Sequence, residues 1–235
     1  MVSIDTVYQK VLALANKEQR GYITPQEFNL FADQAQKEIF EQYFYDLNQF
    51  SRGNTSSAEY ADIVSFLNEK INAHKTVDTY QVSGGSGQIN INLNCYRLGT
   101  IWDPNGTIVE EIDRDKLLYI QKSNLMKPSN TYPVYTRALN TVTIYPTREE
   151  TGVYRYEYIK QPGYTHPPMW TYVVVNGKAM YDPNNGSLQD FDLHYSEESE
   201  LVYKILKFAG ISMKKTDITQ AAQGMEAVNI QQQKQ

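Results

Sequence analysis

The residue types that most often carry out catalysis or bind metals are scarce in this chain, which has three histidines and one cysteine. His74, His166 and His194 stand far apart, and none has a second histidine or a cysteine at the spacing of metal sites. Cys95 has no catalytic signature around it, and a single cysteine cannot form a disulfide within the chain. We therefore expect these four residues to be structural, and we expect no metal and no cofactor.

A group of carboxylates comes nearest to a hydrolytic site. Glu110, Glu111, Asp113 and Asp115 lie close together in the sequence, and paired carboxylates can serve as general acid and base. A simpler interpretation is the polar face of a strand that leads into a helix, whose N-terminus favours negative charge. No reaction follows from their spacing. We expect no enzymatic activity, and a hydrolase remains an alternative hypothesis.

Tyrosine is the residue type in excess, with 19 in the chain. Tyr154, Tyr156 and Tyr158 alternate with charged residues, so in a strand they share one face. Such a face fits either the core of a sheet or a contact surface, because tyrosine combines a large apolar ring with a polar tip. A carbohydrate-binding module, in which Trp102 and Trp170 stack against sugars, is therefore a further hypothesis.

The charge and hydropathy of the chain exclude several classes of protein. Acidic residues number 27 and basic residues 22, which gives a formal net charge of −5. This balance argues against a protein that binds nucleic acid mainly by electrostatics. The first residues lack the basic and apolar regions of a signal peptide, and the apolar run at 172–175 is too short to span a bilayer. We expect neither export nor membrane insertion.

The first elements that the sequence predicts are helices. Residues 4–15 have the period of an amphipathic helix. A second helix begins at Thr24-Pro25-Gln26-Glu27, where a capping threonine, a proline in the first turn and a glutamate form a capping box. We expect this helix to extend to about residue 47.

The second helix is apolar on more than one side, which is typical of a helix between neighbouring chains or in a core. Its second apolar side includes Phe40, Phe44 and Tyr45, and we expect these three residues to contact other chains. A third helix follows, with Ser56 as its cap.

The middle of the chain is rich in Val, Ile, Thr and Tyr, with Gly, Pro and Asn between the runs. Asp103–Gly106 predicts a hairpin turn, and Asp182–Gly186 a similar one. A short helix over 114–123, capped by Asp113, interrupts the strands. The expected strands are 77–82, 99–102, 107–112, 133–137, 141–145, 153–159, 172–175 and 179–181.

The C-terminal part returns to a helical period. Ser196 caps a helix that we expect to end at Gly210 in a left-handed conformation. A last amphipathic helix begins near residue 216, and its apolar positions Ile218, Met225 and Val228 are expected to reach a neighbouring chain.

Together these patterns predict an α+β fold, in which N- and C-terminal helices form a helical base and a mostly antiparallel β domain is inserted between them. The expected parts are an N-terminal helical part (1–75), a β-rich insertion (76–190) and C-terminal helices that complete the base (191–235).

Several stretches together resemble virion proteins of tailed bacteriophages. They are ANKEQRGYITPQEFN (15–29), AQKEIFEQYF (35–44), NTVTIYP (140–146), YEYIKQP (156–162), PMWTY (168–172), DFDL (190–193) and the segment 196–210. The group that the chain is most similar to is the head–tail connector adaptor, or tail ring, proteins of short-tailed phages, including crAss-like phages.

The resemblance implies a dodecameric ring beneath the portal and supplies no catalytic residues. Its implied protein partners are further copies of the chain, the portal protein, and adjacent tail ring or tail hub proteins. Genomic DNA is implied to pass through the lumen during ejection without sequence-specific binding. No membrane partner is implied. The implied location is the virion, at the head–tail junction or tail, after assembly in the host cytoplasm. Other phage tail subunits and the carbohydrate-binding module remain alternatives.

Overall fold

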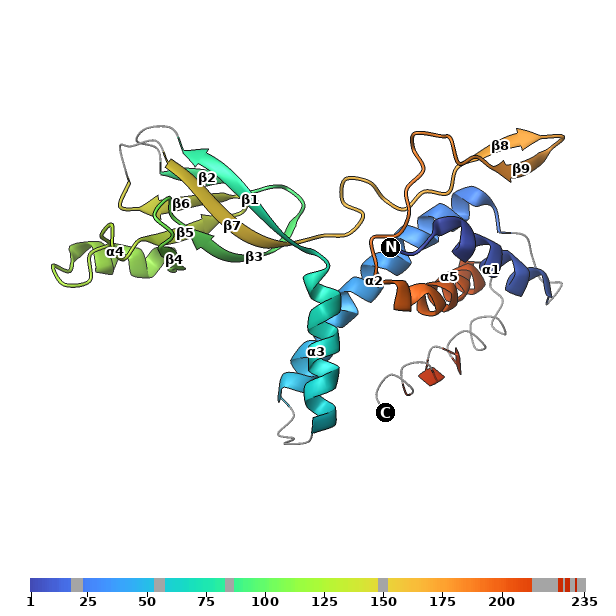
Figure 1. Ribbon diagram of the computed structural model, residues 1–235, viewed down its shortest axis with the longest axis horizontal. Helices are drawn as coiled ribbons and strands as arrows, with labels where there is room; N and C mark the ends of the chain where they lie inside the picture. Colours follow the sequence, from blue (N-terminus) through green and yellow to red (C-terminus); the bar gives the residue numbers. More distant parts are fainter. Residues whose placement is uncertain are drawn as a thin grey trace. The chain divides into compact units, whose positions relative to one another are not determined.

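The computed structural model describes residues 1–17, 23–52, 58–82, 87–147 and 152–212, together with 224–225, 227–228 and 231 (Figure 1). The chain divides into two compact units. Unit 1 consists of Met1–Ala73 and Pro162–Gln235, and unit 2 of His74–Gln161. The prediction of a mixed α and β protein with a mostly antiparallel sheet is confirmed.

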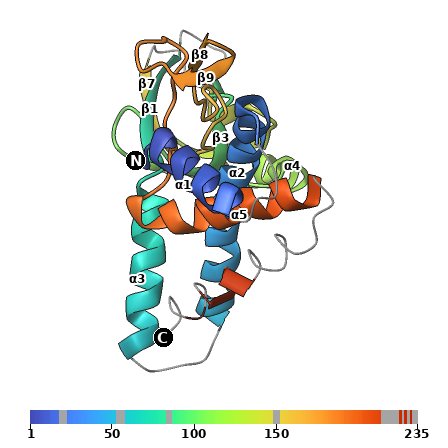
Figure 2. The ribbon, with the colours of Figure 1, turned by 90° about the vertical axis from the view of Figure 1, so that its right-hand side faces the viewer.

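Helices form most of unit 1. They are α1 (Ile4–Lys17), α2 (Pro25–Arg52), α3 (Ala58–Asn72), the 3₁₀ turn η1 (Tyr195–Glu197) and α5 (Glu198–Ser212). Helix α5 packs against α1 and α2, and α2 packs against α3 (Figure 2). Their shared core consists of side chains at helical spacing, which include Val7, Val11, Phe28, Ala35, Ile39, Leu201 and Ile205.

The start of α2 is fixed by the predicted capping box. The Thr24 backbone N–H donates to Glu27 Oε2 at 3.0 Å, and the Glu27 backbone N–H donates to Thr24 Oγ1 at 3.3 Å. The Thr24 hydroxyl also donates to Glu27 Oε2 at 2.8 Å. The Thr24 backbone N–H lowers the pKa of Glu27 most, and the Thr24 hydroxyl lowers it further. The box therefore satisfies donors that a helix leaves open at its N-terminus.

The segment between unit 2 and η1 also belongs to unit 1. It contains the hairpin of β8 (Tyr172–Val175) and β9 (Lys178–Tyr181), and the isolated bridges Met169↔Gln189 and Val2↔Phe191. Asn176 and Gly177 form the hairpin turn with φ of 52° and 76°. The Asn-Gly pair suits such a turn because both residues adopt positive φ at low cost.

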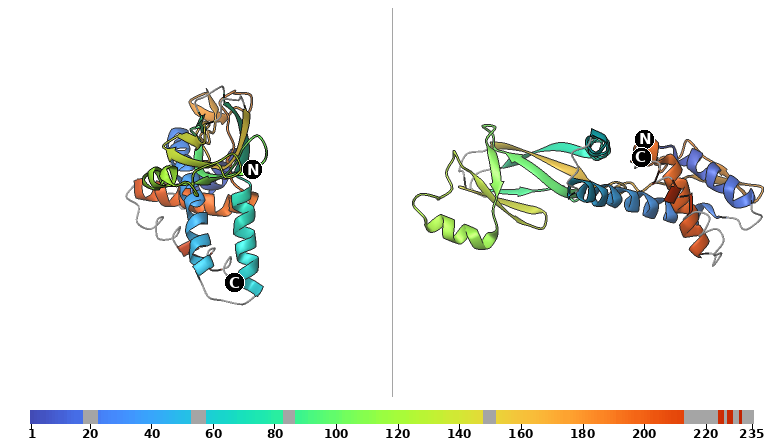
Figure 3. Two further views of the ribbon diagram at one scale, coloured as in Figure 1. Left: turned by 90° about the vertical axis from the view of Figure 1, so that its left-hand side faces the viewer. Right: turned by 90° about the horizontal axis from the view of Figure 1, so that it is seen from below.

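Unit 2 contains one seven-stranded sheet in the order β1-β7-β3-β4-β5-β6-β2. The strands are β1 (Lys75–Val82), β2 (Gln88–Asn90), β3 (Cys95–Trp102), β4 (Ile108–Glu111), β5 (Val134–Ala138), β6 (Thr141–Tyr145) and β7 (Gly152–Lys160). Every pair is antiparallel except β4 and β5. Helix α4 (Arg114–Lys122) connects β4 to the segment before β5 and contacts β5 (Figure 3).

The tyrosines of β7 lie inside unit 2. Tyr154, Tyr156 and Tyr158 are buried among aliphatic side chains of the other strands, whereas Val153 and Arg155 point to the opposite, exposed face. The Tyr158 hydroxyl donates to Asp78 Oδ2 at 2.9 Å. Burial, together with the Asp78 carboxylate, raises the pKa of Tyr158 to about 12. Of the two interpretations of this face, the structure therefore favours the sheet core.

Some expected details differ from the structure. Residues 162–190, expected in the β-rich part, belong to unit 1, where Trp170 packs on Tyr8 of α1. Gly210 lies within α5, because a glycine costs a helix only about 1 kcal/mol and the packing of α5 outweighs that cost. Strand β2 was not expected from the sequence, since it is only three residues long.

Ser196, expected to cap the helix before Gly210, lies inside η1 instead, and His194 occupies the N-cap position of that turn. Asp113 occupies the N-cap position of α4, but its side chain makes no capping hydrogen bond and pairs instead with Lys116 Nζ at 2.8 Å. The expected cap at Ser56 and the expected start of the last helix near residue 216 lie outside the described residues.

The capping box gives a first prediction. Thr24→Ala removes the hydroxyl that pairs with Glu27 and is expected to lower the free energy of unfolding by about 1 kcal/mol. Thr24→Ser keeps a hydroxyl at the same position and should remain within about 0.5 kcal/mol of the wild type. Urea unfolding followed by circular dichroism measures both, and equal stability of the two variants would contradict the assignment.

Candidate interaction surfaces

The structure separates the residues that the sequence predicted for an interface. Phe40 and Phe44 are buried within the chain, with ring centroids 5.2 Å apart in an edge-to-face pair. The expectation that these two contact other chains is therefore wrong, because they lie one turn apart on the core side of α2. Tyr45 lies on another side of α2 and is 67% exposed.

The other predicted interface residues belong to the C-terminal part of the chain. Met225 and Val228 have exposed side chains, as a contact with a neighbouring chain requires. Ile218 lies outside the described residues.

The residues considered for chemistry have structural surroundings. Asp113 pairs with Lys116, whose ammonium lowers the pKa of the Asp113 carboxyl, whereas a general acid at neutral pH needs a raised pKa. Glu111 accepts a hydrogen bond from the Tyr135 hydroxyl at 3.3 Å. Burial raises the pKa of the Cys95 thiol, which disfavours the reactive thiolate. In the ranges that the structure describes, no three His, Cys, Asp or Glu side chains are grouped to hold a metal ion.

His194 and Ser196 resemble a base and a nucleophile only in distance. His194 Nδ1 lies 3.0 Å from Ser196 Oγ, and Ser196 Oγ donates to Glu197 Oε1 at 3.0 Å. A nucleophilic serine must have its proton directed to the base, whereas this hydroxyl donates to a buried carboxylate. His194 also occupies the N-cap position of η1 and accepts from the Ser196 backbone N–H at 3.5 Å. The group is therefore a helix cap.

Trp170 connects the segment 162–190 to the helices of unit 1. Its indole N–H donates to Asp5 Oδ1 of α1 at 2.9 Å. Its backbone N–H donates to Asn29 Oδ1 at 2.9 Å, and its carbonyl accepts from Asn29 Nδ2 at 3.1 Å. The ring of Tyr8 packs against the indole with ring centroids 4.1 Å apart, and the ring of Tyr181 stacks on it with centroids 5.9 Å apart. The side chain is 2% exposed, so Trp170 does not serve as a platform for sugars.

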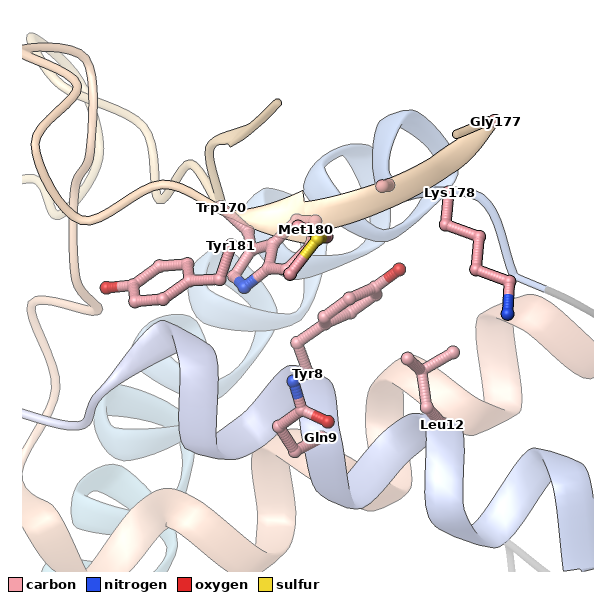
Figure 4. Close-up of a pocket in the computed structure, with 9 residues that line it drawn as sticks. Tyr8, Gln9, Leu12, Trp170, Gly177, Lys178, Met180 and Tyr181 are labelled. Carbon is pink, nitrogen blue, oxygen red and sulfur yellow. The ribbon is translucent and has the colours of Figure 1, made fainter. Parts of the chain in front are cut away.

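A cleft of about 480 Å³ lies beside Trp170 in unit 1. Figure 4 shows Tyr8 and Leu12 of α1 on one side, and Met180 and Lys178 of the hairpin on the other. Its aromatic floor is part of the packing that holds the hairpin in place. Unit 2 has a second cleft, of about 800 Å³, lined by the half-buried Trp102 and by Arg155.

Four charged residues are buried together in unit 1. Lys70 Nζ of α3 lies 2.5 Å from Glu197 Oε1, and both side chains are almost fully buried. Lys204 Nζ lies 3.8 Å from Glu200 Oε1 on α5, and it donates to Gln42 Oε1 of α2 at 3.3 Å. The half-exposed Glu38 of α2 is a further carboxylate, 3.6 Å from Lys204 Nζ, so each buried cation has a carboxylate close to it, which limits the cost of burying its charge. We call Lys70, Glu197, Glu200 and Lys204 the buried charge cluster.

The cluster contains one carboxyl with a pKa near neutrality. Burial, and next the charge of Glu197, raise the pKa of Glu200 to about 7. Tyr43 of α2 lies beside the same carboxylates, and burial raises the pKa of its hydroxyl. The cluster thus joins α2, α3 and α5 through charges whose pairing depends on pH.

Large apolar side chains are exposed on α4 and the segment after it. They are Leu118 (62% exposed), Tyr119 (78%), Leu125 (94%), Met126 (65%) and Tyr132 (76%), which we call the α4 surface. Only Leu117 of α4 is buried, so one side chain anchors the helix and most of its apolar residues face outward. Sequence reasoning missed this surface. The mixture of lysines with Leu, Met and Tyr over 116–132 was the signal that could have indicated it.

No protein-family model and no curated protein matches the chain. None of the helices in the described ranges has the length and hydrophobicity that a bilayer-crossing segment needs.

Trp170 gives a second prediction. Trp170→Phe keeps an aromatic ring but removes the donor to Asp5, and we expect a loss of about 1–3 kcal/mol in unfolding free energy. Trp170→Ala should cost about 3–5 kcal/mol, because it also leaves a cavity. Circular dichroism during urea unfolding measures both. Trp102→Phe is the matched control, since Trp102 is half-buried and is expected to tolerate the change better; an equal effect at both positions would contradict the role of Trp170.

Glu200 gives a third prediction, on pH dependence. Its pKa is about 7 in the folded chain against an ordinary value of 4.5, so the folded chain holds a proton that the unfolded chain releases between these values. Stability should therefore fall as pH rises from about 4.5 to about 7 and should then level off. Glu200→Gln should remove this dependence of the unfolding free energy on pH. Because a glutamine carries no charge to bury, the variant should be more stable than the wild type above pH 7.

The groups that face Glu200 are Glu197, Lys204, Lys70 and Tyr43, and all are kept in this variant. Glu198→Gln is the control, since Glu198 forms a more exposed pair with Lys10. Thermal unfolding between pH 4 and pH 9 supplies the profiles. A Glu200→Gln profile parallel to that of the wild type would show that Glu200 does not titrate in this range.

Proposed function

We propose that this chain is a non-enzymatic virion structural protein, a ring-forming adaptor between the portal and the tail of a short-tailed phage. The α4 surface is the observation that carries the proposal. Five large apolar side chains within residues 118–132 are exposed to water, and groups of exposed apolar side chains are typical of sites of protein association. The sequence resemblance to phage connector proteins supplies the kind of assembly.

The division of the chain supports distinct roles for its two units. In the proposed adaptor, unit 1 is the helical base that meets the portal, and unit 2 is the β insertion that meets the next tail ring. The proposed ring has twelve copies and surrounds the DNA passage. The acidic balance of the chain suits this passage, since a wall without clustered positive charge does not retain DNA.

The buried tyrosines fit a subunit that must hold its shape on its own. Tyr154, Tyr156 and Tyr158 stabilise unit 2 from within, so its fold does not depend on a neighbour to cover β7. Association can then use side chains that are already exposed, which is the usual case for preformed interfaces.

The oligomeric state tests the proposal directly. Native mass spectrometry of the purified chain, alone and with the portal protein of the same virion, should give a closed assembly that contains about twelve copies of the 27.0 kDa chain. A chain that stays monomeric in both conditions, at concentrations well above those in an infected cell, would contradict the proposal.

The C-terminal segment gives a fourth prediction. Removal of residues 216–235 should weaken assembly while leaving the unfolding transition of the rest of the chain unchanged, because the described residues among them have exposed side chains. Analytical ultracentrifugation and thermal unfolding measure the two effects separately. Assembly equal to that of the full chain would refute a role for this segment in neighbour contacts.

A further inference from the structure

The α4 surface is positively charged as well as apolar. Residues 113–132 carry the basic residues Arg114, Lys116, Lys122 and Lys127, all exposed, and two acidic residues, Asp115 and Asp113, the second of which pairs with Lys116. This segment therefore has a formal net charge of +2 in a chain whose total is −5, so the remaining residues carry −7. A partner that suits this surface combines acidic groups with exposed aromatic or aliphatic side chains.

Two adjacent helices of unit 1 carry exposed residues of that composition. On α3, Asp62, Phe66 and Glu69 are spaced as i, i+4 and i+7 and are all exposed. On α2, Glu41 and Tyr45 are spaced as i and i+4 and are also exposed. We call these five residues the α2–α3 face. Figures 2 and 3 show the two helices running alongside each other.

The α2–α3 face combines negative charge with aromatic rings. Tyr45 is 67% exposed and Phe66 is 41% exposed, so both can still lose accessible area on contact. Lys70, the nearest cation on α3, is buried against Glu197 and against the Phe66 ring at 4.5 Å, and it does not neutralise the exposed carboxylates. The two surfaces are therefore complementary. The α4 surface has lysines together with Leu and Met, and the α2–α3 face has carboxylates together with Tyr and Phe.

We propose that the α4 surface of one copy binds the α2–α3 face of a neighbouring copy. This inference rests on the proposed function, since a ring requires two different surfaces on each subunit that fit each other head to tail. The fit of opposite charges also fixes orientation: two α4 surfaces repel each other, and so do two α2–α3 faces. A second copy of this chain is therefore the partner that we infer, because its α2–α3 face offers carboxylates together with exposed aromatic rings.

Complementary charge reversal tests the contact in the full chain. Lys122→Glu/Lys127→Glu and Glu41→Lys/Glu69→Lys each place like charges at the contact, and each variant alone should associate at least about tenfold more weakly than the wild type. An equimolar mixture of the two should associate more strongly than either alone, because each reversed surface then meets a partner of opposite charge. All four positions are exposed, so the fold is expected to be retained, and circular dichroism checks it.

The matched control is Lys75→Glu/Lys178→Glu. It changes the net charge of the chain by the same amount as the α4 variant, at exposed lysines outside both surfaces. Association is measured by sedimentation, with portal present where the wild type requires it. If the α4 variant associates as strongly as this control, the α4 surface is not the contact, while the ring itself stands. If the wild type does not associate under any condition, the proposed function fails together with the contact.

A photo-cross-linking amino acid at Leu125, the most exposed apolar residue of the surface, identifies what the surface touches. With equal amounts of heavy- and light-isotope chain, we expect cross-links between different chains that map to α2 and α3. Cross-links within one chain, or to unit 2 of the second copy, would overturn the proposal. So would binding to phosphatidylserine vesicles without cross-links between chains.

Discussion

The packing of Trp170 is the interaction on which the arrangement of unit 1 depends. Its backbone is held by both polar atoms of the Asn29 amide, its indole N–H by Asp5, and its ring by Tyr8 and Tyr181. These contacts join three parts of the chain that are far apart in sequence: α1, α2 and the segment that carries β8 and β9. The backbone N–H, the carbonyl and the indole N–H of Trp170 each have a hydrogen-bond partner. Burial of the ring therefore adds to stability without leaving a polar group of Trp170 unsatisfied.

The two units solve the problem of buried polar groups in different ways. Unit 2 buries tyrosines whose rings fill the sheet core while a hydroxyl reaches a carboxylate, as Tyr158 does with Asp78. Unit 1 buries full charges in the cluster that contains Lys70 and Glu197, which ties α3 to the turn before α5. Such a cluster adds little net stability, but it penalises any arrangement of the helices that leaves one charge unpaired. Both units are thus stabilised from within, while apolar residues such as Leu125 remain exposed.

Local patterns in the sequence predicted the features that depend on neighbouring residues. Three such features were predicted correctly, because each depends on chemistry within a few residues. They are the capping box at Thr24, the turn at Asp103–Gly106 and the strand of alternating tyrosines. What the sequence could not supply was the direction of a side chain on an element apolar on several sides. Phe40 and Tyr45 have the same local signature, and only the position of the neighbouring helices decides which of them is buried. The partners of Trp170 and Lys70 are likewise distant in sequence, so no local pattern indicates them.

A three-dimensional reconstruction of the purified assembly by electron cryomicroscopy would show both whether the ring closes and what covers the α4 surface. We predict a closed ring in which Leu125 and Met126 of each copy lie against α2 and α3 of the next. A closed ring whose α4 surface faces solvent, or particles that contain a single chain, would contradict it.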